Sequence, residues 1–166
     1  MFLAQQAAKQ GLTPEEAYAT LRNPLKEKVL ECLMKEQGHL CAYCMRKIPD
    51  ERPGIPHQSI EHWLAQNPQD GEDSGQGLDY ANFLAVCSGN RGGIDRGKDR
   101  LTCDAHRGNE PLTVDPTDPT TLRTIFYSEN GDIGASDPII NDDLVVTLNL
   151  NCVSDDGSLP ASRKGA

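Results

Sequence analysis

Two cysteines three residues apart, Cys41 and Cys44, constrain this chain more than any other feature of its sequence. A pair at this spacing can point both thiols at one metal ion or can form a redox dithiol. Two further cysteines follow in the same central region, Cys87 after 42 residues and Cys103 after another 15. Four thiols gathered in this way favour a structural zinc site, although the second pair lacks the tight spacing of a zinc ribbon.

The alternatives to zinc are a redox dithiol and free thiols in the core. A redox C-x-x-C is typical of a βαβ pattern, which the sequence around Cys41 does not have. Residues 1–12 lack the apolar segment of a secretory signal, and no apolar run is long enough to span a membrane. We therefore expect a cytoplasmic protein with no membrane contact, in which cysteines are more often metal ligands or free thiols than disulfides.

Composition sets a limit on the core and on the partners. The 166 residues are 37% apolar and 5% aromatic, with 15 glycines and 11 prolines. This composition is typical of a small, loop-rich domain whose core needs support from a cross-link such as a metal site, or from a partner. The net charge of −9 disfavours binding to a phosphate backbone, because that binding depends on Lys and Arg. If the chain binds nucleic acid, the positive charge for that binding must then come from a local basic loop, a divalent ion or a partner protein. The insert 88–102 carries most of the central basic residues, and it is either such a loop or an ordinary solvated one.

The N-terminal residues 1–37 are predicted to be helical. Thr13 and Pro14 favour the start of one helix that runs to about Arg22, and apolar positions at helical spacing predict a second over 24–37. Gly38 is expected to end it. A core over 38–115 should contain a short turn and strand around the first cysteines, a strand at "SIEHWL", and a helical or turn-like "LDYANFLAVC".

The remaining chain divides into an extension over 116–153 and a tail over 154–166. Asn130-Gly131 predicts a hairpin turn within 121–136, and "PIINDDLVVTLNLN" favours a helix over a strand. The tail is small and polar, so we expect it to be flexible. The fold class is thus α+β.

Polar residues of the kind that bind metal ions or transfer protons lie between and after the cysteines. Glu61 and His62 combine a hard carboxylate with an imidazole, a pair that suits a metal-assisted hydrolase. Further candidates follow at Asn82 in "DYAN", at Asn90 in "GNRGG", and at Asp104 and His106 in "CDAHRGN". Asn82 and Asn90 also have a simpler interpretation, because asparagine is common in turns.

The order of these motifs resembles the HNH endonucleases. Their frame runs C-x-x-C, then an acid-His pair, then Asn before an apolar residue, then a second cysteine pair followed by an acidic or polar residue and Lys-Gly. Residues 38–110 follow this order as "CAYC", "IEHW", "ANFL" and "CDAHRG". The chain departs from the frame in two respects, with Arg107 in place of the lysine and with 88–102 inserted between Cys87 and Cys103. The resemblance implies a ββα-metal core with a zinc site, N-terminal helices and a C-terminal hairpin and helix.

Within that family the chain is most similar to PtuB, the small HNH subunit of Septu-type antiphage systems that also accompanies some retrons. The shared features include the leading helix, "CAYC", "IEHW", "NFLAVCSGNRG" and "VDP". This resemblance implies a nuclease subunit that acts on DNA, or on RNA such as tRNA, under the control of a PtuA-like ATPase. A different class remains open, namely a zinc-stabilised module that binds nucleic acid or protein without catalysis.

The resemblance also implies a role for each residue. His62 is the general base, Glu61 and Asp104 hold a Mg²⁺-like ion, and Asn82 braces the loop that aims His62. Asn90 and His106 are the alternatives to Asp104 for the third position of the motif. Zinc is held by the four central cysteines, which are Cys41, Cys44, Cys87 and Cys103.

Overall fold

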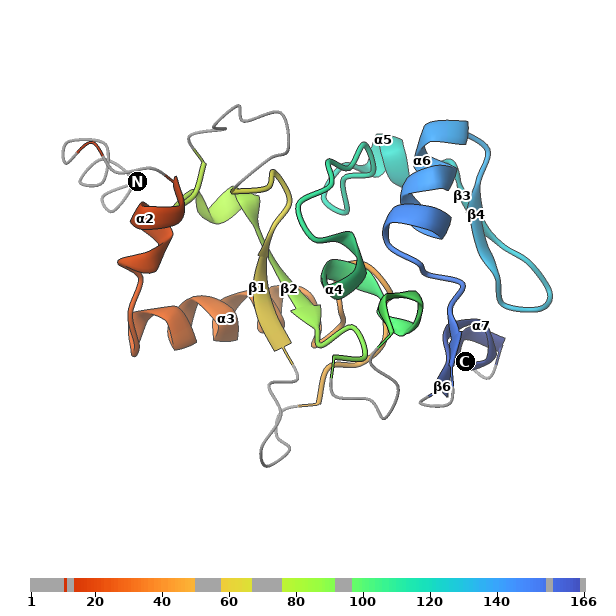
Figure 1. Ribbon diagram of the computed structural model, residues 1–166, viewed down its shortest axis with the longest axis horizontal. Helices are drawn as coiled ribbons and strands as arrows, with labels where there is room; N and C mark the ends of the chain where they lie inside the picture. The colour runs from red at the N-terminus through yellow and green to blue at the C-terminus, as the bar shows by residue number, and fades with distance from the viewer. Residues whose placement is uncertain are drawn as a thin grey trace.

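The structure, a computed structural model, describes residues 11, 14–49, 58–66, 76–91, 97–154 and 157–164. Short helices and two-stranded antiparallel sheets alternate along the described chain (Figure 1), which confirms the α+β class. The helices are α2 (Pro14–Ala19), α3 (Leu25–Glu36), α4 (Cys103–Arg107), α5 (Pro119–Leu122), α6 (Pro138–Asp142) and α7 (Leu159–Lys164), with 3-10 turns η1 (Tyr80–Asn82) and η2 (Lys98–Arg100) and a π-helical turn η3 (Asp143–Thr147). The strands are β1 (Gln58–His62), β2 (Phe83–Cys87), β3 (Ile125–Tyr127), β4 (Ile133–Ala135), β5 (Val153–Ser154) and β6 (Gly157–Ser158).

Both predicted N-terminal helices are present. The helix α3 ends as predicted at Gly38, which has a φ of +61° that an L-residue with a side chain rarely adopts. The amide of Gly38 donates to the carbonyl of Lys35 at 3.2 Å, and that of His39 donates to Met34 at 2.8 Å. These two bonds close the last turn and start the chain on its path to the first cysteines. The predicted cap residue Thr13 lies outside the described residues.

The central sheet pairs β1 with β2 in antiparallel register, from Gln58 opposite Cys87 to His62 opposite Phe83. The expectation that "LDYANFLAVC" is helical or turn-like was therefore wrong for residues 83–87 and correct only for η1. A continuous apolar run of this length can form a buried helix or a buried strand, and here pairing with β1 selects the strand. Figure 1 shows α4 beside this sheet, where it contacts β2.

The C-terminal third contains the predicted hairpin and helix. β3 and β4 pair around a loop that contains Asn130-Gly131, and α6 continues into η3. The expected flexible tail was wrong for the described residues, because 157–164 form β6 and α7. Leu159 is 2% exposed within the core, and the Arg163 guanidinium donates to the Leu150 carbonyl at 2.8 Å. Burial of Leu159 and the hydrogen bond from Arg163 therefore order residues 157–164, which their composition alone predicted to be flexible.

One buried cluster joins the segments. It includes Leu33 of α3, Val86 of β2, Cys103 of α4 and the fully buried Leu148 and Leu150. The four cysteines of the central block belong to this same cluster or pack against it. The thiols thus lie at the centre of the core, where α3, the central sheet and the C-terminal third meet.

Candidate metal centre and carboxylate site

The sulfur atoms of Cys41, Cys44, Cys87 and Cys103 all lie within 4.8 Å of one another. The measured sulfur pairs are Cys41–Cys103 at 3.9 Å, Cys44–Cys87 at 3.8 Å and Cys87–Cys103 at 3.8 Å. Four sulfurs bound tetrahedrally to zinc, at Zn–S distances of about 2.3 Å, stand about 3.8 Å apart. These four cysteines could therefore bind a metal ion such as zinc, and the predicted set of thiols is the set that the fold brings together.

Cys41 and Cys44 lie on a tight turn that directly follows α3. The Cys41 amide donates to the carbonyl of Arg46 at 3.0 Å, and the Met45 amide donates to the carbonyl of Cys41 at 3.0 Å. An isolated bridge between Leu40 and Lys47 closes the base of the turn. This turn places both thiols beside those of Cys87 and Cys103, as a metal site would require.

Cys87 ends β2 and Cys103 begins α4, so the second pair is assembled from the two ends of the insert. Gly89, with a φ of +56°, lies so close to α4 that a Cβ there would stand 2.2 Å from the Thr102 carbonyl oxygen. The Thr102 amide also donates to the Gly89 carbonyl at 3.0 Å. We call this contact between Gly89 and Thr102 the neck of the insert. It holds Cys87 and Cys103 together in place of a C-x-x-C turn.

The electrostatics of the thiols favour a cation at their centre. Hydrogen bonds from the three neighbouring thiols, and then burial, raise the pKa of Cys103 well above its ordinary value. The pKa of Cys44 is instead lowered, because Cys103, Cys41 and Cys87 act as hydrogen-bond partners of its thiolate. Four buried sulfurs in contact cannot all ionise unless a positive charge compensates them, and a divalent ion supplies that charge.

A second polar cluster surrounds Arg107, the last residue of α4. The Arg107 side chain is completely buried, and its Nη1 donates to Glu61 Oε1 at 2.6 Å. The same nitrogen donates to the Tyr43 hydroxyl at 3.1 Å and to the His62 carbonyl at 3.0 Å, while Nη2 donates to the Trp63 carbonyl at 2.6 Å. Arg107 therefore fixes the end of β1, which carries the predicted acid-His pair.

Asp104 lies one turn before Arg107 on α4 and faces the same carboxylate. Burial first, and then the negative charge of Asp104, raise the pKa of Glu61 to about 8, and Arg107 offsets only part of this effect. Asp104 itself makes an ion pair at 3.1 Å with Arg91, whose side chain is 54% exposed, while that of Asp104 is 16% exposed. A buried carboxyl group whose proton affinity is raised by a neighbouring carboxylate is an arrangement that a divalent cation relieves.

His62 follows Glu61 on β1, so its side chain lies on the opposite face of the strand. The imidazole is 6% exposed and lies edge-on between the rings of Tyr18 and Phe83, at centroid distances of 4.6 and 4.9 Å. Its Nε2 lies 3.1 Å from the Gly77 carbonyl and donates to it, which leaves Nδ1 as the nitrogen able to accept a proton. Burial lowers the pKa of His62, so the ring is neutral at pH 7.

Asn82 lies beneath the segment that follows β1. Its Oδ1 accepts from the Leu64 amide at 2.7 Å, its Nδ2 donates to the Leu64 carbonyl at 3.1 Å, and its own carbonyl accepts from the Trp63 amide at 3.0 Å. Asn82 is thus a brace for the chain after His62, in the manner that the family resemblance implies.

The other two candidates for the third position make their contacts elsewhere. Asn90 donates to the carbonyl of Arg100 at 2.9 Å, inside the insert, and has the positive φ of 67° that suits an asparagine in a turn. His106 Nδ1 lies 2.9 Å from the carbonyl of Thr147 in η3. Of the three candidates, Asp104 is the one whose negative charge raises the pKa of Glu61.

The thiol cluster and the carboxylate site differ in how closely their members converge. Among the described residues, the four cysteines are the one group of three or more Cys, His, Asp or Glu placed to hold an ion. Sequence reasoning missed Tyr43, Tyr18 and the structural role of Arg107. The arginine did carry a signal, since it fills the position of the motif's lysine, but burial of a guanidinium has no signature in one sequence.

No protein-family model matches the chain, and no curated protein is significantly similar to it. None of the helices within the described residues is long and apolar enough to cross a membrane.

Proposed function

We propose that this chain is a metal-dependent HNH endonuclease subunit that hydrolyses phosphodiester bonds of nucleic acid in antiphage defence, with a PtuA-like ATPase as its regulator. The observation that carries the proposal is that Arg107 holds the end of β1, where the Glu61 carboxyl group lies close to Asp104 of α4 and His62 follows with its imidazole on the other face of the strand. These residues lie at the end of β1 and on α4, beside a four-thiol cluster that would hold zinc as a structural ion. The order of the motifs in the sequence and the proximity of Glu61 to Asp104 both support the proposal.

The chemistry follows from the states of these groups. The neutral His62 imidazole, with its Nε2 proton committed to the Gly77 carbonyl, would accept the proton of an attacking water at Nδ1. Glu61 and Asp104 would hold a Mg²⁺-like ion, which supplies charge stabilisation for the scissile phosphate. Arg107 touches no substrate in this scheme and acts by holding Glu61 in position.

The buried position of His62 is consistent with control by a partner. Tyr18 of α2 covers one edge of the imidazole, and Lys26 lies 4.8 Å from the centre of the Tyr18 ring. Because the whole residue is only 6% exposed, an attacking water would need the side chains packed on the imidazole, Tyr18 among them, to move. The N-terminal helices are thus a surface at which an ATPase could license the nuclease.

His62→Ala should lower the rate of nicking by about 10²- to 10⁴-fold, the usual contribution of a general base. The assay uses supercoiled plasmid DNA and tRNA with added Mg²⁺, together with phage protection in cells that carry the chain and its ATPase. Zinc content and circular dichroism of the variant should match wild type. His106→Ala is the matched control, and it should keep its activity. Unchanged nicking and protection in His62→Ala would leave only the non-catalytic zinc module.

Nicking should also rise with pH through pH 8 and level off only above it. Metal binding needs Glu61 as a carboxylate, and the pKa of about 8 means that the metal-free protein holds a proton there through neutral pH. The apparent Mg²⁺ affinity should therefore increase as pH rises toward 8. Because the pKa of His62 is already lowered, the imidazole adds no further rise above its ordinary range. A rate independent of pH between about 6 and 8 at subsaturating Mg²⁺ would contradict the assignment of Glu61.

A further inference from the structure

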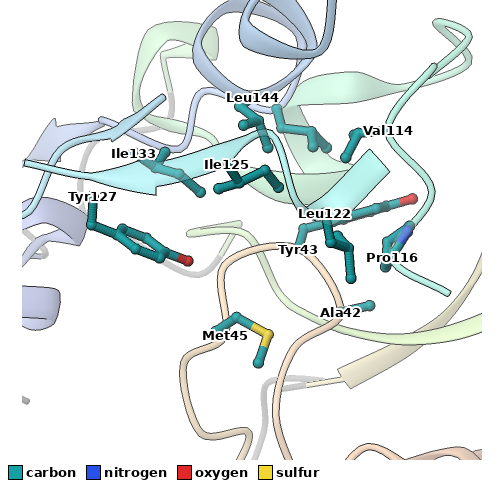
Figure 2. A pocket seen from close by; sticks show the side chains of 11 residues that line it. Ala42, Tyr43, Met45, Val114, Pro116, Leu122, Ile125, Tyr127, Ile133 and Leu144 are labelled. Atoms are coloured by element: carbon teal, nitrogen blue, oxygen red, sulfur yellow. The ribbon is translucent and has the colours of Figure 1, made fainter. Parts of the chain in front are cut away.

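A groove runs between the cysteine turn and the C-terminal hairpin, on the side of Tyr43 away from its hydroxyl partners. Its first part is an apolar cavity of about 330 Å³, with walls that include Val114, Ile125 and Leu144 (Figure 2). Its second part is a cavity of about 560 Å³ that contains Arg46, Lys47, Arg163 and Lys164. Met45 and Tyr127 line both cavities, so the two form one continuous groove.

The charge of this groove is opposite to that of the chain. The protein carries a net charge of −9, yet no acidic residue lines either part of the groove. Lys47 and Lys164 are exposed, whereas Arg46 and Arg163 are partly buried. Arg46 is a hydrogen-bond partner of the Cys44 thiol, so part of its charge compensates the thiol cluster. The two lysines remain as the cations directed at solvent.

An aromatic side chain lies where the apolar and basic parts meet. Tyr127 is 55% exposed, and the Arg163 guanidinium lies 5.7 Å from the centre of its ring. Arg163 is itself held by hydrogen bonds to the carbonyls of Gly131 and Leu150. Figure 2 shows Tyr127 and Met45 extending from opposite sides of the groove, and Met45 is likewise 55% exposed.

We propose that this groove binds single-stranded nucleic acid, with one unpaired base in the apolar part, stacked on Tyr127, and the adjoining phosphates on Lys47 and Lys164. The inference rests on the proposed action on nucleic acid and adds the preference for a single strand. A base offers a flat apolar face for the aromatic ring, and its phosphates match the basic part. A base inside a duplex is paired and stacked and cannot enter a cavity of this kind.

A single side chain, that of Tyr43, separates the groove from the carboxylate site. The Tyr43 ring forms part of its apolar wall, while the Tyr43 hydroxyl lies 3.4 Å from Glu61 Oε1 and accepts from Arg107. A strand held in the groove thus contacts the same tyrosine that contacts the proposed metal-binding carboxylate.

The test is binding of a labelled 12-nucleotide single strand, DNA or RNA, to the full chain without added Mg²⁺, measured by fluorescence anisotropy. We expect the single strand to bind at least tenfold more tightly than the matching duplex. Tyr127→Ala should weaken binding about tenfold and Tyr127→Phe should retain it, because stacking needs only the ring. Lys47→Glu with Lys164→Glu should weaken binding at least tenfold and reduce the salt slope by about 1.4, the value for two phosphate contacts to a single strand.

Arg22→Glu with Lys28→Glu is the matched control, since it makes the same change in net charge at two exposed positions outside the groove. Equal binding by the control and the groove variants would overturn the proposal, as would duplex binding as tight as that of the single strand. Loss of ATPase binding in the groove variants with unchanged nucleic-acid binding would overturn it in favour of a protein dock. Groove-dependent binding by a chain that cleaves nothing would instead support the groove and refute the nuclease.

Discussion

Cys41→Ser should release the metal ion and unfold most of the chain at 37 °C. The thiol is completely buried at the centre of the core, and its sulfur lies 3.9 Å from that of Cys103. Structural zinc in small domains contributes an apparent binding free energy of about 10–16 kcal/mol, so the loss of one ligand should lower stability by several kcal/mol. Zinc per chain is measured by elemental analysis, and unfolding by thermal denaturation.

Cys32→Ser is the control for this change, because Cys32 is an exposed cysteine of α3 outside the cluster. It should keep one zinc per chain and the melting temperature of the wild type. The assignment of the metal centre fails if purified wild-type protein contains no zinc, or if Cys41→Ser retains both its metal and its stability.

Arg107→Ala should lower the free energy of unfolding by several kcal/mol, because each buried acceptor left without a donor costs about 1–3 kcal/mol. The guanidinium is 0% exposed and donates to Glu61, Tyr43 and three backbone carbonyls. Its removal leaves those buried oxygens without a donor, and each unsatisfied group adds to the cost. The free energy of unfolding is measured by chemical denaturation. Activity should fall as well, because the position of Glu61 depends on Arg107.

Arg91→Ala is the matched control on the same side of α4. Arg91 pairs with Asp104, but its side chain is 54% exposed, and an ion pair of that kind contributes about 0–1 kcal/mol. Equal destabilisation by the two alanine variants would mean that Arg107 is no more important than a surface residue. The double variant Arg107→Met with Glu61→Gln should recover part of the lost stability, since it replaces the ionisable carboxyl group along with its partner.

The elements that could be predicted from the sequence are those specified by local chemistry. Helix α3 has apolar residues at helical spacing and a glycine at its end, the hairpin has Asn130-Gly131, and the cysteine turn has the spacing of a metal site. The residues that could not be predicted depend on distant contacts. Strand β2 exists because β1 pairs with it, and α7 is ordered because Leu159 enters a core formed by remote segments.

The candidate site divides in the same way. The four thiols, Glu61, His62 and Asp104 could be singled out as residue types in a known order. The burial of these side chains could not be predicted from the sequence, and burial sets their pKa values and their access to solvent. It lowers the pKa of His62, raises that of Glu61 to about 8, and places Tyr18 over the imidazole. Periodicity carries no information about which aromatic ring covers which histidine.

The neck at Gly89 and Thr102 separates the geometry of the site from the length of the insert. The entropy of closing a loop grows only with the logarithm of its length, so that a doubling costs about 0.6 kcal/mol. Since Gly89 and Thr102 already hold Cys87 and Cys103 in place, residues between them can be added, removed or exchanged at little cost to the thiol cluster. The irregular spacing of the second cysteine pair is therefore a position where the chain can accept new sequence, and with it new recognition, while the geometry of the four thiols is retained.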